Sequence, residues 1–219
     1  MSILGGKNGY IEKNNDHLLL VFTNTEVDTD KTFKSWWAKE FPDLKAIPGL
    51  SKPLHLKRDK DQRPGHCPYW KYMMAFGFKG DVKLMRDAVQ AHIPNGDTVL
   101  WFFEAFAPLY NRKWDPKDKE EHIFMALTNP VPGRAADYNE WYNEHHVKDI
   151  VAIDPYRSGR RFHRIAYNGH APYEYIAFYR FTGPEVKMHK NLMDFIDTHD
   201  IAETDAYELN DLAWVYSAL

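Results

Sequence analysis

The chain has 219 residues, of which 44% are hydrophobic and 15% are aromatic, and its formal net charge is -3. This length and composition are typical of one large globular domain or two small ones, either of which can bury a core. Acidic and basic residues are interspersed, so the sequence lacks the basic surface that nucleic-acid-binding proteins need.

The single cysteine excludes an internal disulfide and a metal–thiolate cluster. The N-terminal segment "MSILGGKNGYIEKNNDH" lacks the basic-then-apolar pattern of a signal peptide, and no apolar run approaches the length that spans a membrane. We therefore expect a soluble, cytoplasmic protein that binds neither membranes nor nucleic acid.

The first half of the chain contains four predicted strands and two predicted helices. Short apolar runs predict the strands, and apolar residues at helical spacing predict the helices. In chain order, the segments are a strand over 17–24, a helix over 33–44, strands over 50–59 and 69–78, a helix over 81–93 and a strand over 97–106. This β-α-β-β-α-β order is that of a ferredoxin-like unit.

The second half repeats the first. The segment "LVFTNTEVDTDKTFKSWWAKEFPDLKAIPGL" aligns with "MALTNPVPGRAADYNEWYNEHHVKDIVAIDPY", and "PYWKYMMAFGFKGD" aligns with "PYEYIAFYRFTGPE". Between the halves, "YNRKWDPKDKEE" is charged and contains proline, which is typical of a linker. We predict a tandem duplication in which residues 1–109 form the first repeat, 110–121 the linker, and 122–219 the second repeat, which carries the active site.

An antiparallel sheet of this kind has one face covered by two helices and the other face bare. Two such sheets can bury their bare faces against each other. The predicted fold is therefore α+β, with two tandem ferredoxin-like repeats forming a pseudo-dimeric α+β barrel that has its helices outside. Tyr72 and Tyr175 occupy matching positions on the third strands and would line either the barrel or the helix-facing core. Assembly of these chains into homo-oligomers stays open.

The helix of the second repeat carries the motif "WYNEHHVKD", which begins at Trp141. This motif resembles the "WY(D/N)E-x-H-L-P-E" helix of the EthD-like group in the dimeric α+β barrel superfamily. "IDPY" stands in place of the group's "PGF" turn, whereas the first repeat has a closer match to the turn, "IPGL", and a poorer one to the helix. The resemblance implies the fold. It implies no single reaction, because the superfamily includes cyclases, isomerases, lyases, cofactor-free monooxygenases and haem proteins.

The two repeats differ along one face of their first helices. The first repeat has Phe33, Trp37, Phe41 and Leu44, and the matching residues of the second are Tyr138, Tyr142, His146 and Asp149. The spacing i, i+4, i+8 and i+11 places each set on one helix face. Each polar group left unpaired in a core would cost about 1–3 kcal/mol, and the first repeat folds without them. We therefore predict a pocket against the second helix and a filled, apolar counterpart against the first.

Proton transfer is the chemistry that this face suggests. Histidine ordinarily titrates near neutrality, so His146 would act as the general acid or base. Asp149 would hydrogen-bond one nitrogen of that ring and fix its tautomer, and Tyr142 would donate to a developing oxyanion or orient the substrate. In the alternative interpretation, His146 and Asp149 form a structural pair near the helix end.

Five further residues are predicted to bind substrate. They are Tyr138, Asn129, Tyr175, His163 and Trp141. Asn129 ends its strand as Asn24 does in the first repeat, so a turn or cap role is the alternative. The strand that carries His163 otherwise has the residue pattern of a solvent-exposed edge strand. His145 points about 100° away from His146 on a helix, so the pair does not predict a metal site, and no metal ligands are expected.

These features predict a cofactor-independent enzyme that acts by general acid/base catalysis on a small apolar or aromatic molecule, of the lyase, isomerase, dehydratase or cyclase type. No cofactor is expected, because the sequence has no nucleotide-binding or metal-binding motif. Two alternatives stay open. One is a cofactor-free monooxygenase or haem-binding relative, and the other is a non-catalytic small-molecule binding protein.

Overall fold

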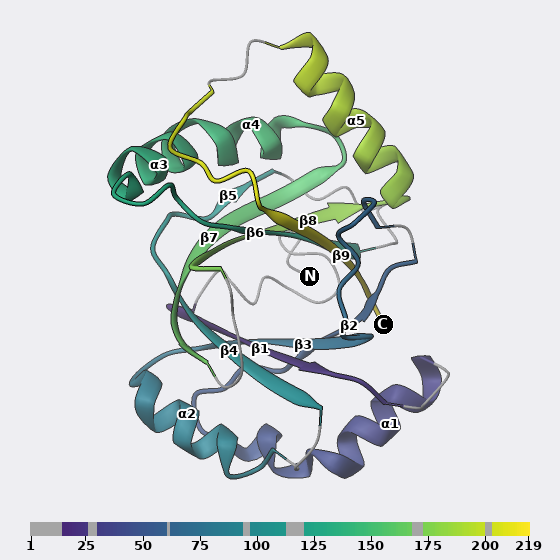
Figure 1. Cartoon of the computed structure of the whole chain (residues 1–219). Helices are drawn as coiled ribbons and strands as arrows, with labels where there is room; N and C mark the ends of the chain where they lie inside the picture. Colours follow the sequence, from purple (N-terminus) through teal and green to yellow (C-terminus); the bar gives the residue numbers. More distant parts are fainter. Residues whose placement is uncertain are drawn as a thin grey trace.

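The computed structural model describes residues 15–25, 30–60, 62–93, 97–112, 121–167, 173–199 and 203–219. In this part of the chain, eight strands form a closed antiparallel barrel, and the helices lie outside it. Figure 1 shows α1 and α2 on one side of the barrel and α3, α4 and α5 on the opposite side. None of the described helices is both long enough and apolar enough to span a membrane.

The same order of elements occurs in each half. The first half has β1 (His17–Thr23), α1 (Asp30–Glu40), the 3-10 helix η1 (Pro42–Ala46), β2 (Leu54–Arg58), β3 (Tyr72–Phe78), α2 (Val82–Gln90) and β4 (Thr98–Ala105). The second half has β6 (Glu121–Thr128), α3 (Ala135–Trp141), the π-helix η2 (Tyr142–His146), α4 (Val147–Ala152), β7 (Tyr156–Tyr167), β8 (Tyr175–Thr182), α5 (Glu185–Thr198) and β9 (Leu212–Ala218). Residues 110–111 of the predicted linker form a short strand, β5 (Tyr110–Asn111), and residues 113–120 lie outside the described part of the chain.

The strands follow the order β4-β1-β3-β2 in the first half and β9-β6-β8-β7 in the second. Two seams join the halves, because β2 pairs with β9 and β4 pairs with β7. The predicted closed α+β barrel is thus confirmed. Neither seam could be predicted from local patterns, since each joins strands that are far apart in the chain.

Three hydrophobic cores fill this architecture. The barrel interior is packed with large side chains, including the stacked rings of Trp101 and Trp214, whose centroids lie 5.9 Å apart. One outer core lies between each sheet and its helices. Tyr72 belongs to the first outer core and Tyr175 to the second, so both tyrosines face helices and not the barrel interior.

The helix face predicted to be filled in the first half is filled. Phe33, Trp37, Phe41 and Leu44 are all buried in the first outer core. The ring of Phe33 stacks on that of Tyr72 at 3.9 Å, and Trp37 stacks on Phe41 at the same distance. Aromatic stacking therefore occupies the space that a pocket on this side would need.

Gly159 of β7 allows α4 to pack close to the second sheet. A Cβ at this position would lie 2.7 Å from Cδ1 of Tyr179 and 2.9 Å from Cγ2 of Val151. Both neighbours are buried in the second outer core and have little room to move. We expect G159A to lower the free energy of unfolding by about 1–3 kcal/mol, measured by urea denaturation. An unchanged midpoint would show that α4 can shift outward without cost.

Candidate functional site

The first helix of the second half contains a π-helical turn. The segment α3–η2–α4 runs without a break, and its central turn, η2, covers Tyr142–His146. The sequence predicted a uniform α-helix. The π turn contains one extra residue, which shifts the helical period after it. As a result, the imidazole of His146 stacks on Trp141, five residues earlier, at 4.6 Å. Single π-helical turns occur often at functional sites.

His146 is held between two rings. It stacks on Trp141 and meets the ring of Tyr142 edge to face at 4.8 Å. Its Nδ1 is buried and has no hydrogen-bond partner among the described residues. Burial, and then the nearby charge of Arg161, lower the pKa of His146 to about 4. The imidazole is therefore neutral at physiological pH and able to accept a proton.

Asp149 lies in the first turn of α4 and is half-buried. No hydrogen bond joins the side chains of Asp149 and His146, both of which the structure describes. The carboxylate of Asp149 was predicted to orient the imidazole. In the structure, the rings of Trp141 and Tyr142 orient it instead. The alternative of a structural pair between His146 and Asp149 is not seen either.

Arg161 of β7, which the sequence analysis did not identify, lies beside this helix. Its side chain is fully buried, and among the described residues it has no carboxylate partner. The guanidinium donates hydrogen bonds to Oδ1 of Asn143 at 2.7 Å and to Oδ1 of Asn139 at 2.9 Å. Its Nε is buried and has no hydrogen-bond partner within the described ranges. A buried cation whose acceptors among the described residues are neutral is costly, and a bound anion would offset that cost.

Four aromatic rings surround the guanidinium of Arg161. Its Cζ lies 4.1 Å from the ring centre of Tyr142, 4.8 Å from that of Phe106, 4.9 Å from that of Tyr138 and 5.3 Å from that of Tyr175. Rings favour a cation over their faces, so they stabilise this charge without neutralising it. Burial raises the pKa of both Tyr138 and Tyr142, which keeps their hydroxyl groups protonated.

Tyr175 and His163 complete one side of the cluster. The Tyr175 hydroxyl accepts a hydrogen bond from Nδ2 of Asn139 at 3.2 Å. The His163 ring lies 4.9 Å from the Tyr175 ring, and its Nδ1 lies 3.3 Å from Oε1 of Glu104, across the seam between β7 and β4. The structure therefore brings together most of the predicted site residues on the helix-facing side of the second sheet.

Asn129 is placed differently. Its Oδ1 accepts a hydrogen bond from the backbone N–H of Glu174 at 2.8 Å. Asn24 does the same in the first half, with the N–H of Lys71 at 2.7 Å. In both halves the asparagine thus fixes the residue that precedes the third strand. This repeated bond supports the turn role that was the alternative for Asn129.

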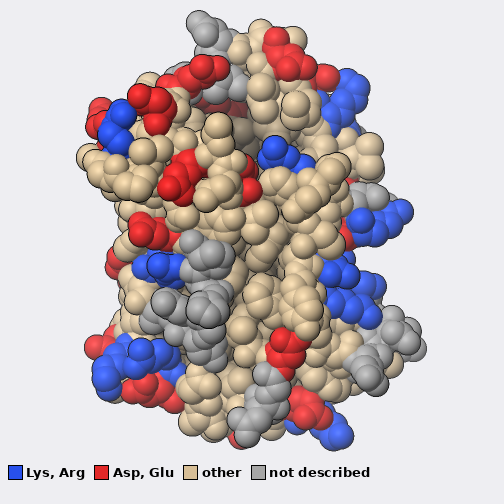
Figure 2. Space-filling view, in the orientation of Figure 1, with Lys and Arg blue, Asp and Glu red and all other residues tan. Residues whose placement is uncertain are grey.

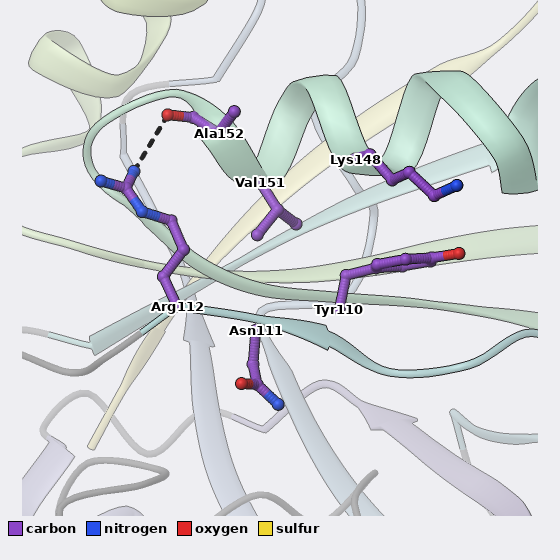
Figure 3. A pocket seen from close by; sticks show the side chains of 6 residues that line it. All are labelled: Tyr110, Asn111, Arg112, Lys148, Val151 and Ala152. Carbon is purple, nitrogen blue, oxygen red and sulfur yellow. Dashed lines mark hydrogen bonds between the residues drawn. The ribbon is translucent and has the colours of Figure 1, made fainter.

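Two surface cavities flank the segment α3–η2–α4. One, of about 410 Å³, lies between β5 and α4, where Tyr110, Arg112 and Lys148 line it (Figure 3). Arg112 donates to the backbone oxygen of Ala152 there. The other, of about 330 Å³, is lined by Asp137, Glu140, Trp141, His145, Glu203 and Thr204. Since Trp141 also stacks on His146, this second cavity reaches the ring next to the imidazole. Figure 2 shows acidic side chains gathered over the helices of the second half.

The described residues do not fit a haem group. In the second outer core, Tyr138 and Tyr142 have ring centroids 5.5 Å apart, and Tyr156 and Tyr179 have ring centroids 5.7 Å apart. All four are fully buried. The other face of the same sheet is covered by the packed barrel interior. These side chains occupy the space against the sheet in which a macrocycle would have to lie.

No protein-family model matches the chain, and no curated protein matches it in sequence. An anthrone oxidase-like protein matches in structure with a TM-score of 0.55 and 9% identity, over 95% of this chain and 93% of that chain. A candidate monooxygenase from Fusobacterium nucleatum has a TM-score of 0.53 and 11% identity, over 94% of each chain. Chlorite dismutase from Candidatus Nitrospira defluvii, in complex with imidazole, has a TM-score of 0.53 and 8% identity, over 94% of this chain and 93% of that chain. These are dimeric α+β barrel folds, and the likeness shows that this chain shares that fold.

Proposed function

We propose that the protein is an enzyme that transfers a proton on a small aromatic molecule, with His146 as the base and Arg161 as the group that holds a negatively charged oxygen. One observation carries this proposal. A buried guanidinium, which has no carboxylate partner in the described part of the chain, and a neutral imidazole contact the same ring, that of Tyr142. A base beside an anion site is the arrangement that stabilises an enolate or phenolate as it forms.

The roles of the surrounding residues follow from their contacts. His146 removes the proton, and the charge that develops on oxygen is stabilised by Arg161 and by the protonated hydroxyl of Tyr142. Asn139 and Asn143 hold the guanidinium in place through their side-chain oxygens. The aromatic body of the substrate contacts a wall of rings, which comprises Tyr138, Trp141, Tyr175 and His163. The reaction is then of the lyase or isomerase type and needs no cofactor.

Substrate enters past Phe106 in this proposal. Phe106 is 37% exposed, yet its ring contacts the fully buried guanidinium and lies 5.6 Å from the ring of Tyr175. It therefore covers part of the cation on the solvent side. Displacement of this one ring would uncover both Arg161 and Tyr175.

The same proposal extends to the origin of the chain. The recurring strand order supports two tandem ferredoxin-like repeats, with the helix of the second repeat modified for an EthD-like site. The hydrogen bonds of Asn24 and Asn129 also support the tandem repeats, because each fixes the residue that precedes the third strand of its half.

Ring opening of 5-nitrobenzisoxazole tests the base directly. A base removes the C–H proton, the N–O bond breaks, and a coloured phenolate forms whose oxygen needs the anion site. We expect catalysis above the buffer rate, and H146Q should reduce kcat/KM about 100-fold or more. H145Q is the matched control. His145 is adjacent to His146 and exposed, and it is not one of the rings that contact His146 or Arg161. Equal losses in both variants, or no rate above buffer, would contradict the proposal.

The names of two structural neighbours favour a second candidate, oxidation of the same kind of molecule by O₂. His146 would again form the aromatic anion, which then reacts with oxygen. Consumption of O₂ in the presence of an anthrone distinguishes the two candidates. A lyase or isomerase would turn over its substrate without consuming O₂.

A further inference from the structure

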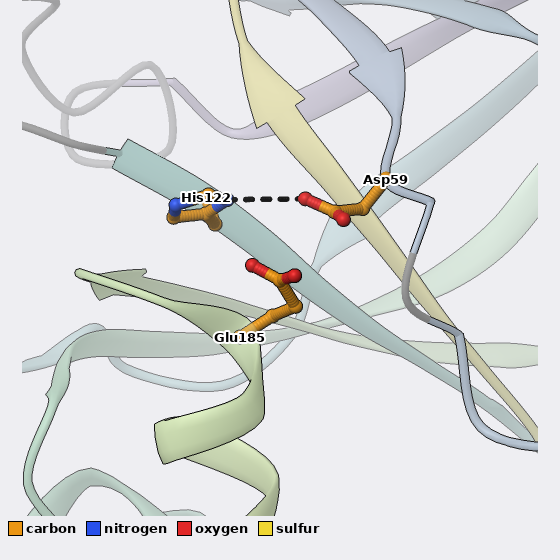
Figure 4. Close-up of side chains that lie close together, drawn as sticks. All are labelled: Asp59, His122 and Glu185. Atoms are coloured by element: carbon orange, nitrogen blue, oxygen red, sulfur yellow. Dashed lines mark ion pairs between the residues drawn. The ribbon is translucent and has the colours of Figure 1, made fainter.

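Three metal-ligating side chains converge at the seam between β2, β9 and β6, outside the site described above. Asp59 follows β2, His122 is the second residue of β6, and Glu185 is the first residue of α5. One ligand atom from each lies within 4.8 Å of the other two. Figure 4 shows the three side chains turned toward one another. The sequence gives no sign of this group, because its members are far apart in the chain.

The group is almost completely buried. Relative exposure is 7% for His122 and 9% for Glu185, and 8% for the side chain of Asp59. Nδ1 of His122 lies 3.6 Å from Oδ2 of Asp59 and 2.9 Å from Oγ of Ser217. The Ser217 hydroxyl also donates to Asp59, so its oxygen is a fourth possible ligand atom in the group. Two buried carboxylates this close repel each other, and a cation between them relieves the repulsion.

The opposite nitrogen of the same imidazole is also informative. Nε2 of His122 is buried and has no partner among the described residues. The ring is held by stacking on Phe181, with centroids 4.8 Å apart. This stacking holds the ring with its Nδ1 toward Asp59. Its Nε2 makes no hydrogen bond to the described residues.

We propose that Asp59, His122 and Glu185 bind a divalent transition-metal ion, with Ser217 as a further oxygen donor. An imidazole nitrogen with carboxylate oxygens suits zinc, manganese or iron, whereas magnesium and calcium prefer oxygen ligands alone. Ligands around a tetrahedral zinc lie about 3.3 Å apart, given bonds of about 2.0–2.1 Å. Small side-chain rotations would close the present separations to that value.

Such an ion would also join the two halves of the chain. Asp59 belongs to the first half, and His122 and Glu185 belong to the second. The ion would sit at the β2–β9 seam, one of the two places where the barrel closes. Binding would therefore stabilise the closed barrel by mass action.

The first half offers a matched control residue. His17 takes the same place in β1 that His122 takes in β6, because His17 pairs with Phe78 and His122 pairs with Phe181. The His17 ring likewise stacks on its partner at 4.8 Å. Among the described residues, however, no carboxylate forms an ion pair with His17. Replacing His17 thus removes the same stacking without removing a metal ligand.

Titration calorimetry of untagged, chelator-treated protein with zinc chloride tests the site. We expect one zinc ion per chain, an increase in Tm on binding, and no binding of magnesium. H122A, D59N and E185Q should each weaken zinc binding about tenfold or more, whereas H17A should bind like the wild type. The amide variants keep the side-chain shape, so they report on ligation even if H122A fails to fold.

Three results would overturn the proposal. The first is the absence of stoichiometric zinc binding by the wild-type protein. The second is unchanged affinity in D59N and E185Q, which would place the ion elsewhere. The third is an equal loss in H17A and H122A, which would show that stacking in the fold, and not ligation, determines the affinity.

Discussion

Replacement of Arg161 by methionine is expected to reduce kcat/KM for ring opening of 5-nitrobenzisoxazole about 100-fold or more, because removing one oxyanion donor typically costs that much. The protein should stay folded. The guanidinium of Arg161 donates hydrogen bonds to Asn139 and Asn143, worth about 1.5–3 kcal/mol each, but burying a cation without a carboxylate costs several kcal/mol. These contributions largely offset each other, and methionine fills the volume of the stem. We expect the free energy of unfolding to stay within about 2 kcal/mol of the wild type.

Arg180 is the matched control for this prediction. It is also fully buried, on β8, but it forms an ion pair with the buried carboxylate of Glu121. R180M removes the cation from that pair and should lower the free energy of unfolding by about 3–5 kcal/mol. A loss of stability in R161M as large as that in R180M would show that Arg161 is structural. The anion-binding role would then be wrong.

The fold could be predicted because its signals are local. Apolar runs define the strands, and the "TN" at the ends of β1 and β6 marks equivalent points of the two halves. The structure gives a physical reason for that repetition. Asn24 and Asn129 each bind the backbone N–H of the residue before the third strand, so the same residue type is needed twice.

The site could be predicted only in part. The helix comparison identified His146 and Tyr142, but it assumed a uniform α-helix and could not anticipate the π turn that stacks His146 on Trp141. The group formed by Asp59, His122 and Glu185 could not be predicted at all, since its members meet only through the tertiary fold.

Arg161 was missed because β7 carries several arginines and was interpreted as a solvated edge strand. A signal for it existed in the predicted duplication. Lys57 pairs with Tyr72 as His163 pairs with Tyr175, which makes His55 the counterpart of Arg161. His55 contacts the rings of the first helix, as Arg161 contacts those of the second. Aligning the second strands would have placed Arg161 against the polar helix face.

The pKa of His146 predicts how stability changes with pH. Its pKa is about 4 in the folded protein and near 6.5 when unfolded. Between these values the unfolded chain binds more protons, so acidification favours unfolding. The contribution of neutral His146 is fully present above pH of about 6.5 and is lost as the pH falls toward about 4, a change of at most about 3 kcal/mol. Urea denaturation at a series of pH values should show a steeper decline for wild type than for H146Q.

The same low pKa predicts the pH dependence of catalysis by His146. A base with an ordinary histidine pKa would be half protonated near pH 6.5 and would lose activity below it. His146 stays neutral well below that point, so kcat/KM for ring opening should be constant through the neutral range and should decline only as the pH approaches about 4. Because the exposed His145 lies outside the ring cluster, H145Q should leave this profile in place. An inflection near pH 6.5 would mean that the reacting base is a solvated histidine, and the buried imidazole beside Arg161 would then have no part in the proton transfer.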